Sequence, residues 1–175
     1  MILTKDQIIQ EVNRKTITID PFDRACLNPN SYNYRLGDKI CEAPLQTTRE
    51  LALPNIATSL TSEGMKLIPG RVYLAHTAEV IGSKKFVTSL IGRSSVGRLG
   101  LFVQLSADLG NLGSAHCWTL ELACVQPTIV YPGMVIGQVS FWVPVGDIVE
   151  YDGRYTDYSL PTGNLMEMYD DPHRS

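Results

Sequence analysis

The segment Gly92–Gly100 holds the densest group of chemically useful side chains in the sequence. Two arginines, two serines and three glycines lie within nine residues, directly after an apolar stretch. Glycines let the main chain turn so that several N–H groups converge on an anion, and arginines offer planar pairs of donors to phosphate oxygens. The segment predicts a site for a phosphorylated or otherwise anionic ligand, and a solvated turn between strands is the open alternative. The spacing of a P-loop is absent.

A second candidate is Glu121, within the apolar segment Trp118–Val125. If this segment is a strand, its residues point alternately to opposite faces, so Glu121 shares its face with Thr119 and Ala123. Apolar residues precede and follow it in the chain. A carboxylate shielded in this way suits proton transfer between water and a substrate, whereas a lone strand glutamate most often faces solvent. The two segments are more informative together than either is alone.

The histidines and cysteines do not indicate a metal site or a nucleophile. His76, His116 and His173 lie far apart and outside any HxE or HExxH pattern. The cysteines contain no CxxC pair, so zinc-binding spacing is missing. We expect the cysteines to act as small apolar residues in a reducing compartment. They are Cys26, Cys41, Cys117 and Cys124.

Composition favours one folded domain. The 175 residues are 44% hydrophobic, and 15 basic against 18 acidic side chains give a net charge of −3. This balance excludes a disordered chain and bulk attraction to nucleic acid or to an anionic membrane. The first ten residues lack a secretory apolar region, and no apolar run could span a bilayer. We expect a cytoplasmic protein with no nucleic-acid or membrane partner.

The candidate residues must be positioned mainly by strands. The N-terminus predicts one short helix, since Thr4 and Gln7 have the spacing of a capping box, and the helix should end near Lys15. A strand over 16–19 follows and ends at Asp20, before a proline. Beyond it no second helix is expected, and the segment 41–63 is predicted to be loop with at most one edge strand. The other expected strands are Val72–Val80, Phe86–Ile91, Leu101–Leu105, Trp118–Val125 and Val135–Val143.

Turn residues at regular intervals between these runs predict a closed or sandwich-like all-β domain. We place this single domain at residues 1–150 and a polar, tyrosine-rich C-terminal tail at 151–175.

Four segments, in order, resemble the signature of the dCTP deaminases, a branch of the trimeric dUTPase superfamily. They are Asn28–Gly37, Gly92–Gly100, Thr119–Leu122 and Tyr131–Gln138, and Asp20–Asp23 also matches. The resemblance spans the chain to about Pro161. It implies a mainly β fold, a dUTPase-like distorted β-barrel or jelly roll of the β-clip type with a short N-terminal helix. It also implies a homotrimer with active sites between subunits.

The implied reaction is a zinc-independent hydrolytic deamination of a cytosine deoxynucleotide, dCTP to dUTP plus ammonia. Glu121 matches the glutamate that activates water for attack on C4 of cytosine and passes the proton to the leaving ammonia. Ser94 and Arg98 match residues that position the base, the water and the carboxylate, and Arg93 matches a phosphate ligand. Family members bind the triphosphate with Mg²⁺, which the phosphate oxygens rather than protein ligands hold.

The resemblance also assigns further substrate contacts. They are Ser95, the main chain near Ala107, Asn111, Gln138, and the tail residues Arg154, Tyr155 and Tyr158, the tail being implied to close over the phosphates.

The sequence departs from the family at some of these positions. Asn111 replaces the aspartate that meets the deoxyribose and helps to activate water in diphosphatase members, and an amide cannot act as a base. Ser114 replaces an aromatic residue. In the tail, Tyr158 and Leu160 replace a glutamine and a glycine. Two alternatives therefore remain: a diphosphatase acting on dUTP or a modified pyrimidine nucleotide, and a non-catalytic nucleotide-binding regulatory trimer.

Overall fold

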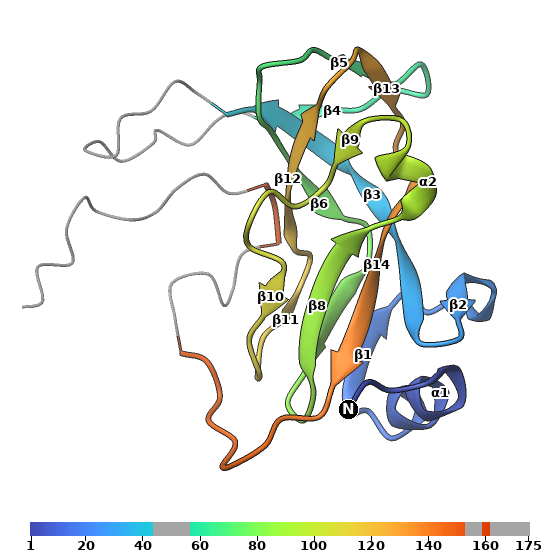
Figure 1. Ribbon diagram of the computed structural model, residues 1–175, viewed down its shortest axis with the longest axis vertical. Coiled ribbons are helices and arrows are strands. Elements are labelled where there is room, and N and C mark those ends of the chain that lie inside the picture. The colour runs from blue at the N-terminus through green and yellow to red at the C-terminus, as the bar shows by residue number, and fades with distance from the viewer. Residues whose placement is uncertain (44–56, 153–158, 162–175) are drawn as a thin grey trace, which may run out of the picture.

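The fold is mainly β with a short N-terminal helix, as the sequence predicts (Figure 1). The computed structural model describes residues 1–43, 57–152 and 159–161. The helical elements are α1 (Lys5–Asn13), η1 (Arg24–Cys26) and α2 (Ser94–Gly97). The strands are β1 (Ile17–Asp20), β2 (Leu27–Asn28), β3 (Ser31–Glu42), β4 (Thr58–Ser59), β5 (Met65–Leu67), β6 (Tyr73–Thr77), β7 (Val80–Ser83), β8 (Val87–Gly92), β9 (Leu101–Phe102), β10 (Leu109–Gly110), β11 (Ala115–His116), β12 (Thr119–Cys124), β13 (Thr128–Val130) and β14 (Val135–Trp142). None of the helices in these ranges is long and apolar enough to cross a membrane.

One curved antiparallel sheet dominates the molecule. Its strands run in the order β10-β8-β14-β3-β6-β12-β9, and β2 and β4 pair with β3. A second sheet has the order β1-β7-β11, and β5 pairs with β13 in a third. In Figure 1, β3 crosses the whole body, so that one strand joins both halves of the large sheet.

The longest strand, β3, was not predicted as a strand. Its sequence alternates as a strand should, because Tyr32, Tyr34 and Leu36 are fully buried while Asn33 and Arg35 are partly exposed. The residues after Gly37 break that alternation at a bulge, where the register with β6 shifts. This irregularity hides the strand from pattern analysis.

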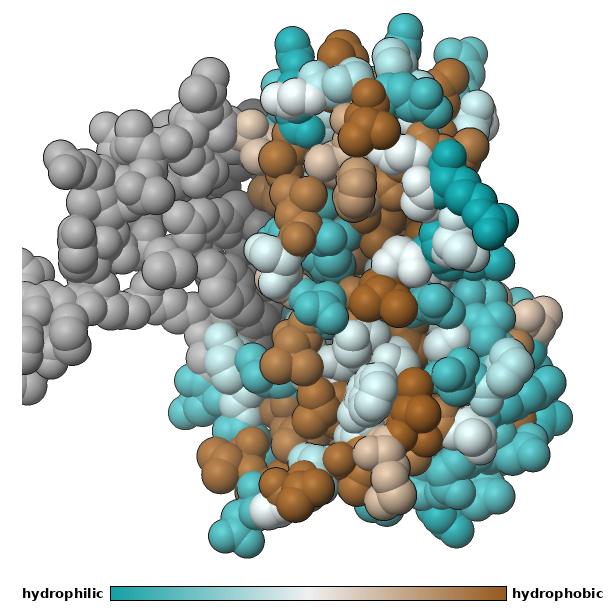
Figure 2. All heavy atoms as spheres, in the orientation of Figure 1, coloured by the Kyte–Doolittle hydropathy of each residue, from teal (hydrophilic) through white to brown (hydrophobic). Residues whose placement is uncertain are grey.

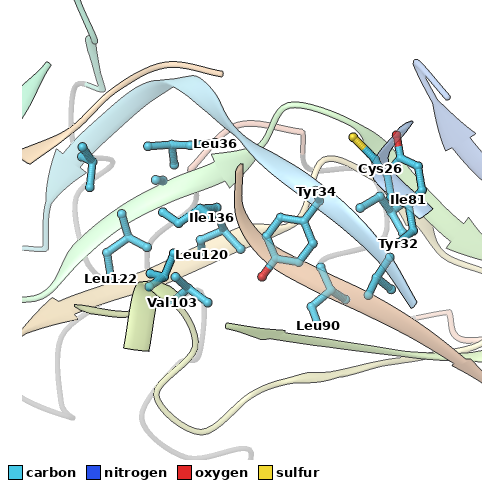
Figure 3. Packing of buried hydrophobic residues seen from close by; sticks show 14 of the residues in the cluster. Cys26, Tyr32, Tyr34, Leu36, Ile81, Leu90, Val103, Leu120, Leu122 and Ile136 are labelled. Atoms are coloured by element: carbon cyan, nitrogen blue, oxygen red, sulfur yellow. The ribbon is translucent and has the colours of Figure 1, made fainter. Parts of the chain in front are cut away.

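Side chains from several strands meet in one core (Figure 3). Tyr34 of β3 lies close to Leu90, while Leu120 and Leu122 of β12 face Ile136 of β14. Gly137 is required beside Tyr34, since a Cβ at this position would lie 2.1 Å from the tyrosine ring. The close approach of backbone and ring holds β14 against β3.

Helix α1 begins after Thr4 as predicted, but the predicted capping box is wrong. Thr4 makes no side-chain capping bond. The Gln7 amide instead donates to Oε1 of Glu11 over 2.8 Å. Glu11 is buried and also accepts from the Thr16 hydroxyl. Because a buried carboxylate needs hydrogen-bond donors, the Gln7 side chain binds Glu11 instead of capping the N-terminus of the helix.

The other predicted strands are present at the expected positions, but some of them differ in length. The predicted strand Val72–Val80 splits into β6 and β7, because the Thr77 hydroxyl donates to the carbonyl of Glu79 over 2.7 Å and fixes a turn there. The predicted strand Leu101–Leu105 pairs only over its first two residues. Strands β8, β12 and β14 lie within about two residues of the predicted ranges. Against prediction, the described residues contain a second α-helix, the single turn α2.

Candidate active site

Glu121 lies in the middle of β12, with buried Leu120 and Leu122 on either side. Its own side chain is half-buried, as the alternation predicts. Strand β6 pairs with it on one edge, opposite Leu74. A crossing segment, Val103–Leu105, covers it on the other edge. The carboxylate is therefore partly shielded and partly accessible, which suits proton transfer.

The crossing segment holds Glu121 at two points. The N–H of Glu121 donates to the carbonyl of Val103 over 3.2 Å, and its Oε2 accepts from the N–H of Leu105 over 3.3 Å. The Gln104 amide donates to the carbonyl of Thr119 over 3.3 Å. These contacts fix one carboxylate oxygen, Oε2, and leave Oε1 without a hydrogen-bond partner in the described part of the chain. These contacts cannot be predicted from the sequence, because each of the three uses at least one main-chain group, which carries no residue-type signal.

The arginine–serine segment forms α2. Arg93 stands at its N-cap, and main-chain bonds from Gly97 to Arg93 (2.8 Å) and from Arg98 to Ser94 (3.0 Å) close the turn. Val96 alone is buried and anchors it. The segment is therefore an ordered turn whose polar side chains lie outside the core.

These polar side chains are unengaged. Ser94, Ser95 and Arg98 are exposed and Arg93 is partly exposed. Within the described residues, none of the four side chains makes a hydrogen bond or an ion pair. Ordered but unpaired donors of this kind are available to an anion or to another chain.

Strand β9 connects the two candidate groups. Helix α2 packs against β9, and β9 pairs with Ala123 and Cys124, two and three residues beyond Glu121. Figure 1 shows α2 and β12 on opposite sides of β9. The structure thus places the two groups in neighbouring elements of one chain, without direct contact between them among the described side chains.

The segment 107–113 forms a third candidate group. Ala107 and Asn111 are exposed. Asp108 anchors the segment to β8, because its carboxylate accepts from the Ser89 hydroxyl over 3.1 Å and its carbonyl accepts from the N–H of Leu90 over 2.8 Å. Asn111 lines an open pocket of about 390 Å³ together with Leu109 and Leu112. Ser114 is buried, so it leaves this surface without the aromatic side chain of the family pattern.

Gln138 is already engaged within the chain. It lies in β14, partly buried, and its Oε1 accepts from the Ser31 hydroxyl over 2.8 Å. Ser31 in turn accepts from the Asn28 amide over 3.1 Å. Of the other assigned positions, Arg154, Tyr155 and Tyr158 lie outside the described residues.

The histidines that the structure describes are core residues. His76 is buried, with its Nε2 accepting from the N–H of Lys39 over 3.2 Å. His116 is buried with its ring 4.2 Å from that of Trp118. The neighbouring Cys117 is a thiol whose pKa is raised by burial, which disfavours the reactive thiolate. No disulfide joins the four cysteines.

Comparisons with known proteins identify the family of the chain. A family model described as dCTP deaminase-like matches residues 2–143. A Hathewaya histolytica protein named dCTP deaminase, dUMP-forming, is 40% identical over 158 residues, covering 89% of this chain and 91% of that protein. A Rhodopirellula baltica protein named dCTP deaminase is 41% identical over 152 residues, covering 86% of this chain and 76% of that protein.

A solved structure supports the fold. The 2′-deoxycytidine 5′-triphosphate deaminase from Agrobacterium tumefaciens superimposes with a TM-score of 0.66 at 21% identity, covering 82% of this chain. This chain covers 48% of that longer chain. The likeness confirms the predicted dUTPase-like fold, and the family model with the relatives at about 40% identity confirms the predicted family. The chain belongs to the dCTP deaminase-like family.

Proposed function

We propose that this chain is a hydrolase that deaminates dCTP to dUTP and ammonia. The observation that carries the proposal is Glu121, a half-buried strand carboxylate fixed through one oxygen by the N–H of Leu105. The names of relatives at about 40% identity supply the substrate.

In this reaction Glu121 takes a proton from water as the water oxygen bonds to C4 of cytosine. The electron pair of the C4–N3 double bond moves to N3 as the water oxygen adds. One water proton then passes through Glu121 to the exocyclic nitrogen and the other goes to N3, so the C4–N bond breaks, ammonia leaves and the C4 carbonyl of uracil remains. Such proton transfer requires a carboxylate within hydrogen-bond reach of the water. Ser94 and Arg98 position the base, the water and the carboxylate.

The phosphates and sugar are assigned to the remaining residues. Arg93 and Ser95 bind phosphate oxygens. The main chain at Ala107 contacts the pyrimidine and Asn111 meets the sugar, while Gln138 supports the site. The chain is organised as a nucleotide-binding domain over 1–150 and a tail over 151–175, and Arg154, Tyr155 and Tyr158 of this tail bind the phosphates.

Mg²⁺ accompanies the triphosphate in this proposal. Among the described residues, no three His, Cys, Asp or Glu side chains gather so as to hold a metal ion. The available donors therefore fit a Mg²⁺ that takes its ligands mainly from phosphate oxygens and water. When bound, the ion would neutralise phosphate charge, and Arg93 is the basic side chain assigned to share that task.

The active unit is a homotrimer with sites between subunits. Exposed apolar side chains surround the candidate site, with Leu99 48%, Phe102 54% and Leu105 49% exposed. Figure 2 shows apolar side chains on the face that carries β8, β9 and β10. Apolar surface of this kind marks interaction sites, and a second subunit would cover it while receiving the unpaired side chains of α2.

The relatives' names favour dUMP as a second candidate product. Forming dUMP requires hydrolysis of a phosphoanhydride after deamination, and the exposed amide Asn111 cannot serve as a base in that step. We therefore expect dUTP to accumulate.

Incubation of the purified protein with dCTP, CTP, dCMP and dUTP plus Mg²⁺, with chromatographic separation of products, tests the proposal. Conversion of dCTP to dUTP with one ammonia released per turnover is expected. Formation of dUMP and pyrophosphate from dUTP, without conversion of any cytosine nucleotide, would replace deaminase with diphosphatase. Nucleotide binding without turnover of any pyrimidine would support the regulatory trimer.

Mixing two inactive variants tests the shared site. Arg98→Ala and Glu121→Gln subunits, unfolded and refolded together, should form hybrid trimers in which about a quarter of the sites hold both original residues, if those residues come from adjacent subunits. Activity of the mixture at the level of the separate variants would place both residues in one subunit.

A further inference from the structure

The turn Asn111–Gly113 is held from two sides, by β7 and by a segment that is distant in the sequence. On the first side, the N–H of Gly113 donates to the carbonyl of Ser83 over 2.9 Å. The chain then continues so close to β7 that a Cβ at Gly82 would lie 1.9 Å from the carbonyl oxygen of Ser114. This side of the turn is fixed by the body of the fold.

On the second side, residues 149–152 lie against the turn. The N–H of Tyr151 donates to the carbonyl of Leu112 over 2.8 Å. Gly113 has a φ of +93°, and a Cβ there would lie 2.9 Å from Cβ of Glu150. The Glu150 carboxylate lies 3.6 Å from Nζ of Lys84. Both the conformation and the contact require glycine at position 113.

The chain leading to this segment makes little contact of its own. Val145 is fully exposed, and Gly146 (φ +101°) has no heavy atom within 4 Å of where its Cβ would lie. The segment 149–152 is therefore held by the turn rather than by its connection to β14. Val149 and Tyr151 line the same pocket as Asn111, so the segment forms one wall beside the proposed sugar contact.

We propose that residues 149–152 form a brace that positions Asn111 for the nucleotide sugar and so helps to discriminate deoxyribose from ribose. This proposal rests on the proposed function for its substrate. A contact that is only structural would affect folding and all substrates alike. A brace acting through Asn111 affects the sugar-dependent part of binding, because misplacement of a positioning residue by a fraction of an ångström weakens the contact it makes.

The first test compares two glycines with similar backbone. Gly113→Ala introduces strain and a clash with Glu150, whereas Gly146→Ala introduces strain alone. Gly113→Ala should raise the KM for dCTP about tenfold with kcat within about threefold, and should lower the ratio of kcat/KM for dCTP over CTP. Gly146→Ala should change neither. Adding Glu150→Gly to Gly113→Ala removes the clashing atoms and should recover part of the loss.

A second variant keeps the test decisive if Gly113→Ala does not fold. Tyr151→Pro removes the N–H that donates to Leu112, and Tyr151→Phe retains it. The proline variant should show the same shift in KM and sugar ratio, and the phenylalanine variant should restore the parental values.

Dissociation constants for dCTP and CTP, measured by calorimetry, separate the two proposals. If the parental chain binds both nucleotides but does not deaminate dCTP, the proposed function fails while the sugar ratio of binding still tests the brace. Folded Gly113→Ala and Tyr151→Pro variants with parental KM and parental sugar ratio would overturn the brace. Equal losses for dCTP and CTP, or the same change in Gly146→Ala, would also overturn it.

Discussion

The polar side chains beside β3 and those on α2 differ in burial and in hydrogen bonding. Beside β3, Glu79 is fully buried, and its two oxygens accept from Nε of Arg35 (2.7 Å) and from the Arg35 N–H (2.9 Å). This hydrogen bond and charge raise the pKa of the Arg35 guanidinium. At α2, by contrast, Ser94 and Arg98 are exposed and have no polar partner among the described residues.

The difference separates polar groups that the fold explains from polar groups that the fold leaves unexplained. A buried charge must be paired, because leaving it unpaired costs several kcal/mol, so Glu79 is explained by the fold alone. Arginines without a polar partner on an ordered turn do not stabilise the monomer. This favours a role for them in contact with a ligand or another subunit. The comparison predicts that substitutions near β3 alter stability and that substitutions near α2 and Glu121 alter activity.

The largest effect is expected at Glu121. Glu121→Gln preserves shape but removes the basic carboxylate, so ammonia release should fall by about 10²–10⁴. Nucleotide affinity should change far less, since the proposed phosphate contacts come from Arg93 and Ser95. Glu63→Gln, an exposed carboxylate, is the matched control. A Glu121→Gln variant with near-parental turnover would show that this carboxylate merely faces solvent.

The next effect concerns Arg93. Hydrogen bonds to charged groups contribute about 1.5–3 kcal/mol, so Arg93→Ala should raise the KM for dCTP roughly 10- to 100-fold with a smaller change in kcat. Its free energy of unfolding should stay within about 0.5 kcal/mol of the parental value. Arg24→Ala, in the exposed part of η1, is the control. Large destabilisation with an unchanged KM for dCTP would show that Arg93 stabilises the fold and does not bind the substrate.

Two buried threonines test how the hydrogen bonding of a buried hydroxyl affects the stability of the fold. The Thr77 hydroxyl donates to the carbonyl of Glu79 and accepts from the N–H of Trp118, whereas Oγ1 of Thr88 has no partner in the described ranges. Thr77→Val should destabilise the protein by about 1–3 kcal/mol, and Thr88→Val should stabilise it by up to about 1 kcal/mol. Urea unfolding at one protein concentration measures both. Equal shifts of the same sign would contradict this explanation.

The smallest effect appears only in acid and involves Glu11. The Thr16 hydroxyl bond, followed by Gln7, Lys85 and Arg14, outweighs burial and lowers the pKa of this carboxyl from 4.5. A lowered folded-state pKa stabilises the protein above about pH 4.5, and this stabilisation is lost as the pH falls through the folded value. Thermal midpoints of Glu11→Gln should therefore depend less on pH below 4.5 than parental midpoints. Parallel pH profiles would exclude this role.

Residue types and spacing predict the strands with regular alternation and the family of the chain, whereas the roles of the site residues stay predictions. The faces of β12, the end of β1 before Pro21 and the family itself all follow from residue types and spacing. Interactions that the main chain makes cannot be predicted from residue types. The bulge in β3, the Leu105 contact to Glu121 and the Tyr151 contact to Leu112 involve backbone groups that every residue possesses. The single turn α2 was missed because four residues are too few to show helical periodicity.

Strand β3 also determines how the molecule can open. It pairs with β14 and β2 near its start and with β6 and β4 near its end, so neither half of the large sheet can detach without breaking it. Amide hydrogens of β3 should accordingly exchange with solvent only through global unfolding. Those of the 111–113 turn, held by single bonds to Ser83 and Tyr151, should exchange through small local openings. The fold thus combines one cooperative unit around β3 with a turn at 111–113 whose two bonds can open without unfolding of the large sheet.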